Sequence, residues 1–205
     1  MASMVMEIRR RFARMAGAAI VAVSVWSLAA VSSAQGWIDY VDLEQRFRIN
    51  LPHEPAVEDS AFLGEYGDEL PVRIYTASDG ISDYKVSVID YRSAGVTENR
   101  ASIAFQALQY RRRGGEVTHD AYAQIDRIEG HQLQITNPDQ SRTFVAIHLH
   151  RGRLYVVEAN APPGAPPPGL VQQSLVMLDE YGNHVRYELD ADGNRARGPS
   201  RRIEL

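Results

Sequence analysis

Cysteine is absent from this chain of 205 residues. Without a thiol the protein forms no disulfide, no iron–sulfur cluster and no zinc–thiolate site, and cysteine catalysis is excluded. The fold must therefore be held together by packing and hydrogen bonds.

Signatures of catalysis and cofactor binding are also missing. No Gly-x-Ser-x-Gly elbow surrounds Ser87 or Ser174, and no glycine-rich phosphate loop occurs. The acidic stretch 190–194 lacks the glycine at position six and the glutamate at position twelve of an EF-hand loop. The sequence therefore predicts no cofactor and points away from an enzyme.

Positive charge is scarce as well: Lys85 is the single lysine, and the whole chain holds 22 basic against 26 acidic residues. The first 34 residues carry four arginines and one glutamate, which leaves 18 basic and 25 acidic residues from Gln35 onward. This acidic balance argues against nucleic acid or an anionic membrane surface as a partner.

The N-terminal segment has the three parts of an export signal: four arginines within residues 9–14, an apolar stretch over Met15–Val31, and small residues at Ser32 and Ala34. The apolar stretch is shorter than the roughly 20 residues that cross a bilayer. We therefore expect a cleavable signal peptide over residues 1–34, cut between Ala34 and Gln35, and no stable membrane anchor afterwards. This predicts a periplasmic or secreted protein.

Two export routes remain open. Residues 8–14 resemble a twin-arginine signal, with Arg9 and Arg10 followed by an aromatic and a basic residue. The alternative is an ordinary Sec signal that is rich in arginine.

Alternating and continuous apolar runs predict a domain of many strands and few helices over residues 35–178. The expected strands cover 37–41, 47–51, 57–63, 72–75, 84–91, 117–128, 132–136, 142–150, 154–159 and 185–189. Helical patterns cover 99–113 and 170–178, and residues 179–205 are expected to form a hairpin or a loose tail. Both faces of the 142–159 hairpin are partly apolar, so both must be covered. The predicted fold class is α+β, an antiparallel β-sheet flanked by helices as an α/β/α sandwich.

Two short repeats of Asp-x-x-Gly-Asn begin at Asp179 and Asp190. They are too few for a repeat architecture, and we expect them to mark turns on either side of the 185–189 strand.

Arg111, Arg112 and Arg113 end the longer helical pattern. Cations are favoured at this negative end of a helix, which gives the three a capping role. The functional alternative is a basic binding patch.

His148 and His150 are the candidate metal ligands, because residues two apart on a strand project from one face and imidazole suits zinc, copper or nickel. A turn at residues 151–152 would set Tyr155 opposite His148, as a candidate binding residue. The preceding strand would bring Glu129 or His131 near as a further ligand. The alternative is structural, since no third ligand is specified.

The Pro162–Pro168 segment is interpreted as a rigid spacer or as a polyproline ligand through which an envelope component works.

The order of these elements resembles the PsbP-like superfamily. The resemblance rests on a hairpin that ends in Phe47-Arg48-Ile49-Asn50-Leu51-Pro52, a tyrosine-rich strand over 84–91, an amphipathic helix, a run of antiparallel strands and a last helix near 172–178. It covers roughly residues 37–178 and implies an α/β/α sandwich that serves as a binding or accessory subunit, with no shared catalytic residues to carry over.

These observations lead to two functional hypotheses. The first is an exported, non-enzymatic binding or accessory domain that interacts with an envelope protein or a small ligand. The second is a metal-binding protein or hydrolase centred on His148 and His150.

Overall fold

The computed structural model describes residues 36–95, 100–168, 171–198 and 201–202, the last two by backbone alone. The predicted signal peptide and its cleavage site lie outside these residues. Gln35–Leu205 forms one compact unit, and among the described residues no helix is both long and apolar enough to span a membrane.

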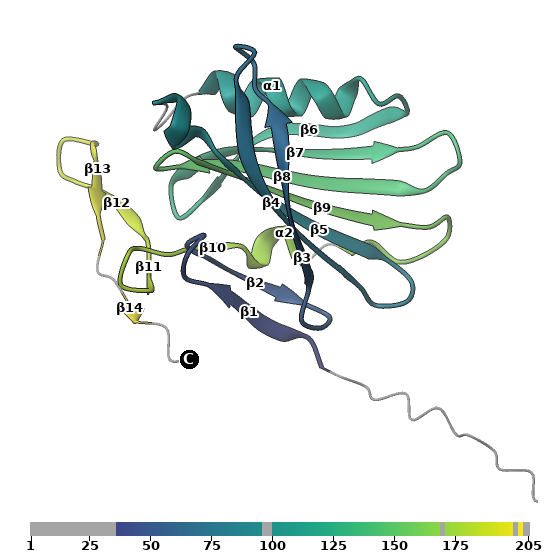
Figure 1. Ribbon diagram of the computed structural model, residues 1–205, viewed down its shortest axis with the longest axis horizontal. Coiled ribbons are helices and arrows are strands. Elements are labelled where there is room, and N and C mark those ends of the chain that lie inside the picture. The colour runs from purple at the N-terminus through teal and green to yellow at the C-terminus, as the bar shows by residue number, and fades with distance from the viewer. Residues whose placement is uncertain (1–35, 96–99, 169–170, 199–200, 203–205) are drawn as a thin grey trace, which may run out of the picture. The chain divides into compact units, whose positions relative to one another are not determined.

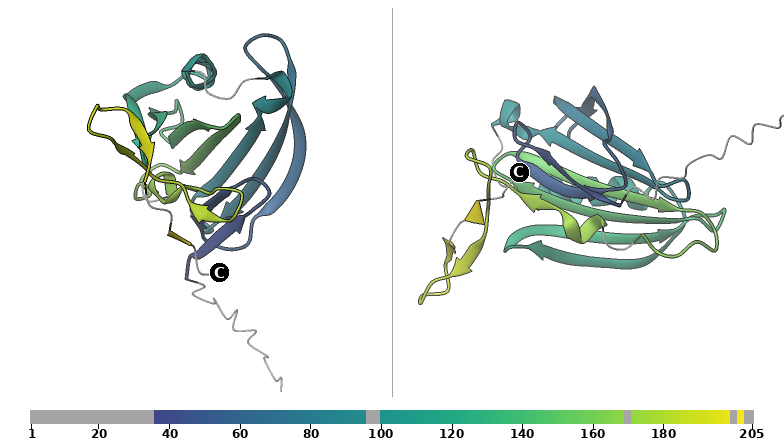
Figure 2. Two further views of the ribbon diagram at one scale, coloured as in Figure 1. Left: turned by 90° about the vertical axis from the view of Figure 1, so that its left-hand side faces the viewer. Right: turned by 90° about the horizontal axis from the view of Figure 1, so that it is seen from below.

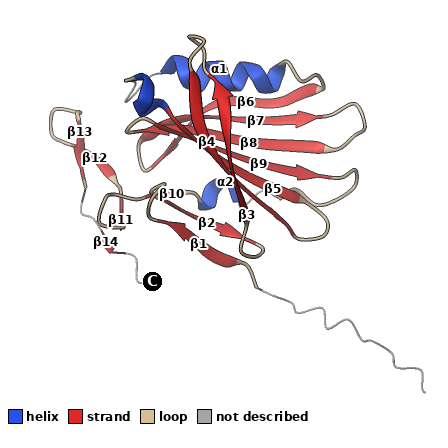
Figure 3. Cartoon of the chain, in the orientation of Figure 1, coloured by secondary structure: helices blue, strands red, loops and turns tan. Residues whose placement is uncertain are grey.

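Seven strands build one antiparallel sheet, in the spatial order β3–β4–β5–β9–β8–β7–β6 (Figures 1 and 3). Their bounds are β3 Ala56–Leu63, β4 Glu69–Ser78, β5 Asp83–Asp90, β6 Glu116–Ile125, β7 Ile128–Thr136, β8 Arg142–His150 and β9 Arg153–Ala161. The sheet is twisted, as Figure 2 shows from two further sides.

One face of the sheet lies under helix α1 (Arg100–Arg111). Ile103 and Ala107 of the helix are buried against a layer of aliphatic side chains that includes Val145 and Ile147 of β8. Hydrogen bonds anchor both halves of the helix: Ser102 donates to Glu65 (2.5 Å), and Tyr110 donates to the buried carboxylate of Glu158 (2.6 Å). The α1 helix is therefore fixed on the sheet.

The opposite face lies under a small three-stranded sheet, β1–β2–β10, and the short helix α2. Their bounds are β1 Ile38–Asp42, β2 Phe47–Leu51, α2 Val171–Ser174 and β10 Val176–Met177. Phe47, Ile49 and Met177 fill a second core cluster with Tyr155 of β9.

The predicted α/β/α sandwich is wrong. A β-sheet covers most of the second face, and α2 is a single turn of four residues. The segment expected to be helical up to Leu178 turns into strand β10 and pairs with β2. All of Leu175–Leu178 is buried, and a run that is apolar at every position has no period with which to separate helix from strand.

The C-terminal segment carries the remaining strands: β11 Asn183–His184, β12 Tyr187–Leu189, β13 Arg195–Arg197 and β14 Arg201–Arg202. The two Asp-x-x-Gly-Asn repeats form turns as predicted. Asp179 Oδ1 accepts from the backbone N–H groups of Tyr181 and Asn183, and Asp190 Oδ1 accepts from those of Asp192 and Asn194. The segment is thus built from paired strands rather than a loose tail.

One turn is displaced from its predicted place. The strand expected to run through residue 128 ends at Ile125, and the chain reverses at Asp126 and Arg127. Both residues have positive φ (48° and 62°), which is the backbone of a tight two-residue hairpin. Glu129, Gly130 and His131, which fall between the two predicted strands, lie inside β7.

Candidate functional site

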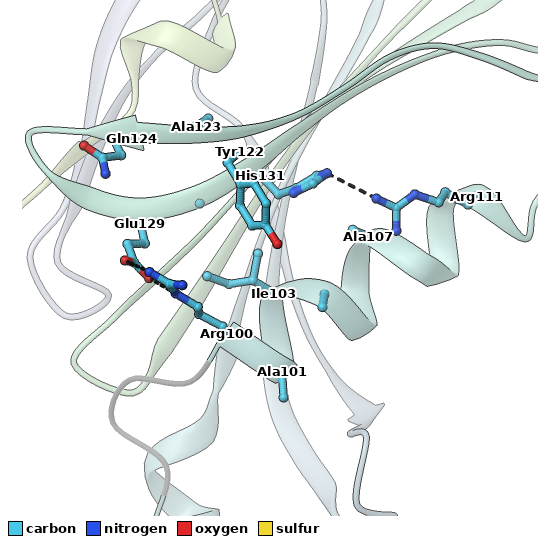
Figure 4. Close-up of a pocket in the computed structure, with 12 residues that line it drawn as sticks. Arg100, Ala101, Ile103, Ala107, Arg111, Tyr122, Ala123, Gln124, Glu129 and His131 are labelled. Atoms are coloured by element: carbon cyan, nitrogen blue, oxygen red, sulfur yellow. Dashed lines mark hydrogen bonds and ion pairs between the residues drawn. The ribbon is translucent and has the colours of Figure 1, made fainter.

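A half-open cleft of about 680 Å³ lies between α1 and the β6–β7 hairpin (Figure 4). Small and apolar side chains of α1 form much of one wall, and the backbone of two small residues of the hairpin contributes to the other: Ala101, Ile103, Ala104 and Ala107, and Ala123 and Gly130. The volume falls within the range of about 300–1,000 Å³ typical of small-molecule sites. We call this cavity the α1 cleft.

Charged groups close one end of the α1 cleft. Arg111 of the helix forms a two-pronged ion pair with Asp120 of β6, with Nε–Oδ2 and Nη2–Oδ1 distances of 2.7 and 2.8 Å. His131 Nε2 of β7 lies 2.5 Å from the same Oδ1. The Arg111 guanidinium and then the His131 ring lower the pKa of Asp120 to about 2, so its carboxylate is ionised at neutral pH.

The geometry fixes which nitrogen of His131 carries a proton. Two acceptors do not approach to 2.5 Å, so Nε2 is the N–H that donates to Asp120. Arg111 Nη2 lies 3.2 Å from the same nitrogen, the contact that a dashed line marks in Figure 4.

Tyr122 stands in the middle of the cleft wall, with its ring edge toward His131 at a centroid distance of 5.4 Å. Its side chain is 87 % exposed although it lines the cavity. An aromatic ring presented to solvent in a cavity offers a surface on which an apolar ligand can pack.

The other end of the α1 cleft carries a second ion pair. Arg100, the first residue of α1, contacts Glu129 of β7 through Nε–Oε2 (2.7 Å) and Nη2–Oε1 (2.5 Å). Arg100 lowers the pKa of Glu129 most strongly, and Arg195 lowers it more weakly. Both ends of the apolar wall are therefore charged.

A second hollow, of about 460 Å³, continues from this end. It shares Arg100, Ile103, Gln124 and Glu129 with the α1 cleft and adds Arg127, Leu149, Leu189, Gly193 and Arg195. We call this hollow the arginine mouth. The C-terminal hairpin β12–β13 thus lines part of the cavity; the sequence predicted a hairpin or a loose tail for this segment and gave it no role.

Arg195 is held in place at the mouth. Its guanidinium stacks over the ring of Tyr187 at 4.4 Å and donates to the backbone oxygen of Arg127 at 3.4 Å. The side chain of Arg127 is exposed at the β6–β7 turn.

The groups in the α1 cleft suit binding better than covalent catalysis. Tyr122 supplies the one hydroxyl among the described residues that line it. Asp120 is occupied by Arg111 and His131, so the carboxylate is not free to activate a nucleophile.

The structure sets the predicted metal ligands on the opposite face of the sheet. His148 and His150 project together from β8 toward the small sheet, as expected, and their side chains are 0 % and 3 % exposed. Burial lowers the pKa of each to about 4, which keeps the imidazoles neutral. No described residues form a group of three or more His, Asp or Glu side chains able to hold a metal.

The suggested further ligands, Glu129 and His131, are on the wrong face. His148 pairs with Gly130 across β7–β8, so the residues on either side of Gly130 point toward α1. The displaced turn is the reason, because it moved these residues from a loop into the strand. The sequence thus missed that Glu129 and His131 belong to the α1 cleft, as well as the roles of Asp120 and Arg195.

Tyr155 does pair with His148 as predicted, but it is a core residue. It is 1 % exposed and donates to the backbone oxygen of Gln45 (2.9 Å). The phenol therefore fastens the β1–β2 turn to the large sheet instead of facing a ligand.

The three helix-end arginines point in different directions and form no single basic patch. Arg111 joins Asp120, whereas Arg113 stacks on Tyr110 at 4.0 Å and lies 3.3 Å from Glu158. Arg112 and Arg113 line a separate shallow hollow with Phe62. Of the three, only Arg111 belongs to the α1 cleft.

The proline-rich segment lies beside aromatic residues of its own chain. Pro166, Pro167 and Pro168 line a hollow of about 420 Å³ with Trp37 and Tyr84, whose rings meet edge-on at 5.2 Å.

Comparison with known proteins finds no matching family model and no matching curated protein. Among solved structures, the chain is similar to a DUF4853 family protein from Actinomyces odontolyticus, at 13 % identity over 76 % of this chain and 77 % of that one. The TM-score of 0.25 is too low to carry an argument about fold or function. The resemblance to the PsbP-like superfamily stays a prediction.

Proposed function

We propose that this protein is an exported, non-enzymatic domain that binds a small, largely apolar ligand in the α1 cleft. The observation that carries the proposal is the cavity itself: about 680 Å³, walled by small apolar side chains and bounded by a fixed ion pair at each end. Concave, mainly apolar sites with a few oriented polar groups are the usual form of small-ligand pockets.

Rigid walls support this function. The α1 helix is tied to the sheet through Glu65 and Glu158, and the facing wall consists of paired strands. A preformed cavity loses little conformational entropy when its ligand binds.

The test is a fluorescence titration with Nile red, a neutral apolar dye, on the purified protein. We expect saturable binding that falls at least about tenfold in Ala104→Trp, because an indole at this exposed position fills the cleft. Leu108→Trp is the matched control, since Leu108 is exposed one turn further along the same helix and does not line the cleft. No dye binding, or equal binding to all three proteins, would reject the proposed site.

Export is part of the proposal and rests on the sequence of residues 1–34. Expression in a bacterial host and N-terminal sequencing of the exported product should find Gln35 first. Replacing Arg9 and Arg10 with lysine separates the routes: loss of export supports the twin-arginine route, and undiminished export supports Sec.

Metal binding at His148 and His150 is the second candidate. One observation favours it: none of the four buried ring nitrogens has a hydrogen-bond partner of good geometry, although the backbone of Ile128 and Glu129 lies near enough to affect the pKa of His148. Metal analysis of the wild type and of His148→Ala/His150→Ala decides it. Equal, negligible metal in both proteins rejects this candidate.

A further inference from the structure

We infer that the ligand is an amphiphile, with an apolar chain in the α1 cleft and an anionic head group, a carboxylate or a phosphate, in the arginine mouth. This inference rests on the proposed function and adds the chemical class of the ligand. It starts from the residues that the two hollows share, which set them next to each other at the N-terminal end of α1; we call the two hollows together the groove.

Charge is distributed unevenly along this groove. At the Arg111 end the cation is neutralised by Asp120, which His131 also contacts. At the other end three arginines, Arg100, Arg127 and Arg195, lie around Glu129, which is the one carboxylate among the described residues that line the mouth. The mouth therefore carries excess positive charge, although the chain as a whole is acidic.

The mouth also offers one guanidinium group whose donors no described residue uses. The Arg127 side chain forms no ion pair or hydrogen bond with any described residue, and the backbone oxygen of Arg127 holds the Arg195 guanidinium beside it. The paired N–H donors of Arg127 match the oxygen atoms of a carboxylate or phosphate, and Arg195 adds a second positive charge next to them.

The apolar wall of the α1 cleft indicates the chemistry of the rest of the ligand. The alanine side chains of α1 and the absence of a side chain at Gly130 of β7 leave room beside Tyr122, and the α1 residues that line the cleft between Arg100 and Arg111 are all uncharged. From Arg100 to Arg111 the helix rises by roughly 16 Å, which suits an extended hydrocarbon chain. A small inorganic anion would leave this part of the groove empty.

The inference is tested by displacing Nile red from the purified protein with dodecanoate, dodecyl phosphate and dodecanol, each below its critical micelle concentration. The three share one chain length and differ in the head group. We expect at least one of the anionic amphiphiles to bind about tenfold or more tightly than the neutral alcohol. This preference should weaken as sodium chloride is raised.

Arg127→Gln, Arg195→Gln and the double variant test the placement of the head group. The preference for the anion should fall in each single variant and nearly vanish in the double variant, with dodecanol affinity unchanged. Arg112→Gln, a change at the exposed residue that follows α1 and lies outside the groove, should keep the preference. Arg127→Gln alone suffices if Arg195→Gln loosens the hairpin, since the Arg127 side chain supports no described contact.

The outcomes distinguish a failure of the inferred ligand class from a failure of the proposed function. Equal affinity for dodecanol and both anions, failure of all three to displace bound dye, or a preference retained in the double variant overturns the anionic amphiphile and leaves the α1 cleft as an apolar site. If neither Nile red nor any amphiphile binds, the proposed function itself fails. Preference for dodecanoate over dodecyl phosphate, or the reverse, supports the inference and identifies the head group.

Discussion

Gly130 lies directly under the imidazole ring of His148. A Cβ atom built on Gly130 would stand 2.1 Å from His148 Nδ1 and 2.4 Å from the backbone oxygen of Ile147. The glycine is therefore required by a close approach between neighbouring strands and not by a turn, and it lets the histidine pack flat on one face while His131 and Glu129 line the cleft on the other.

Gly130→Ala should destabilise the protein by about 1–3 kcal/mol, because the added methyl group forces the ring and the β8 backbone to move. Chemical unfolding monitored by circular dichroism measures the change. Gly36→Ala is the control, since its Cβ meets nothing within 4 Å. Equal stability of both variants would show that β7 and β8 do not approach as closely as described.

Glu158 should account for part of the acid sensitivity of the fold. Burial raises the pKa of this carboxyl, but Lys85, Asn160 and Tyr110 together lower it to about 2. The native state thus holds the charged form more strongly than the unfolded chain, whose glutamates titrate near 4.5. Its stabilisation is complete above about pH 4.5 and is lost as the pH falls toward 2.

Glu158→Gln should lower the free energy of unfolding at pH 7 by about 2 kcal/mol, because it removes charge-assisted hydrogen bonds in a buried site. The stability curve of the variant should be flatter than that of the wild type between pH 4.5 and 2. Glu116→Gln, at an exposed position of β6, serves as control. Parallel curves for wild type and Glu158→Gln would contradict the assigned pKa.

His148 should make the free energy of unfolding depend on pH in a range above that of Glu158. Its pKa of about 4 lies below the usual 6.5, because burial disfavours the charged ring. The unfolded chain therefore binds a proton first as the pH falls, and stability decreases from about pH 6.5 to 4 and levels off below. The loss is on the order of 3 kcal/mol over this window.

His148→Leu should remove that part of the pH dependence, whereas His119→Leu, at an exposed position of β6, should leave it unchanged. Urea unfolding at a series of pH values between 7 and 4 measures both. An unaltered slope in His148→Leu would mean that the ring is not buried in neutral form.

Asp179 should control the C-terminal hairpin. Its carboxylate accepts from the backbone of Tyr181 and Asn183, lies 3 % exposed, and also pairs with Arg197. We expect Asp179→Ala to speed limited proteolysis within residues 180–198 and to weaken dodecanoate binding several-fold, because Arg195 loses its support. Asp192→Ala, a change at an exposed turn position, should do neither.

The strands were largely predictable from the sequence. The strand over Phe47–Leu51 has the predicted bounds, because its burial alternates with a period of two. The strand over Arg142–His150 also has its predicted bounds, although it is buried at nearly every position, because the turn at residues 151–152 marks its end. Residues 175–178 gave no such pattern, which is why strand β10 was taken for helix and the fold class was wrong.

The site was less predictable, since it depends on one turn. The predicted strands 117–128 and 132–136 leave the reversal between them, whereas the chain reverses at Asp126 and Arg127, two residues that adopt positive φ without being glycine. With the turn placed correctly, strand alternation alone sets Asp120, Glu129 and His131 on the face of α1. The position of Arg195 at the mouth depends on contacts between distant parts of the chain, and no local sequence pattern predicts it.

The central claim is tested most directly by NMR spectra of protein labelled at its alanine methyl groups, titrated with dodecanoate. The account predicts saturable shifts at Ala104 and Ala107, which line the α1 cleft, and unchanged signals from Ala77 and Ala159 in the core beneath the small sheet. Shifts confined to methyl groups away from the cleft, or none at concentrations that saturate comparable binding proteins, would contradict it.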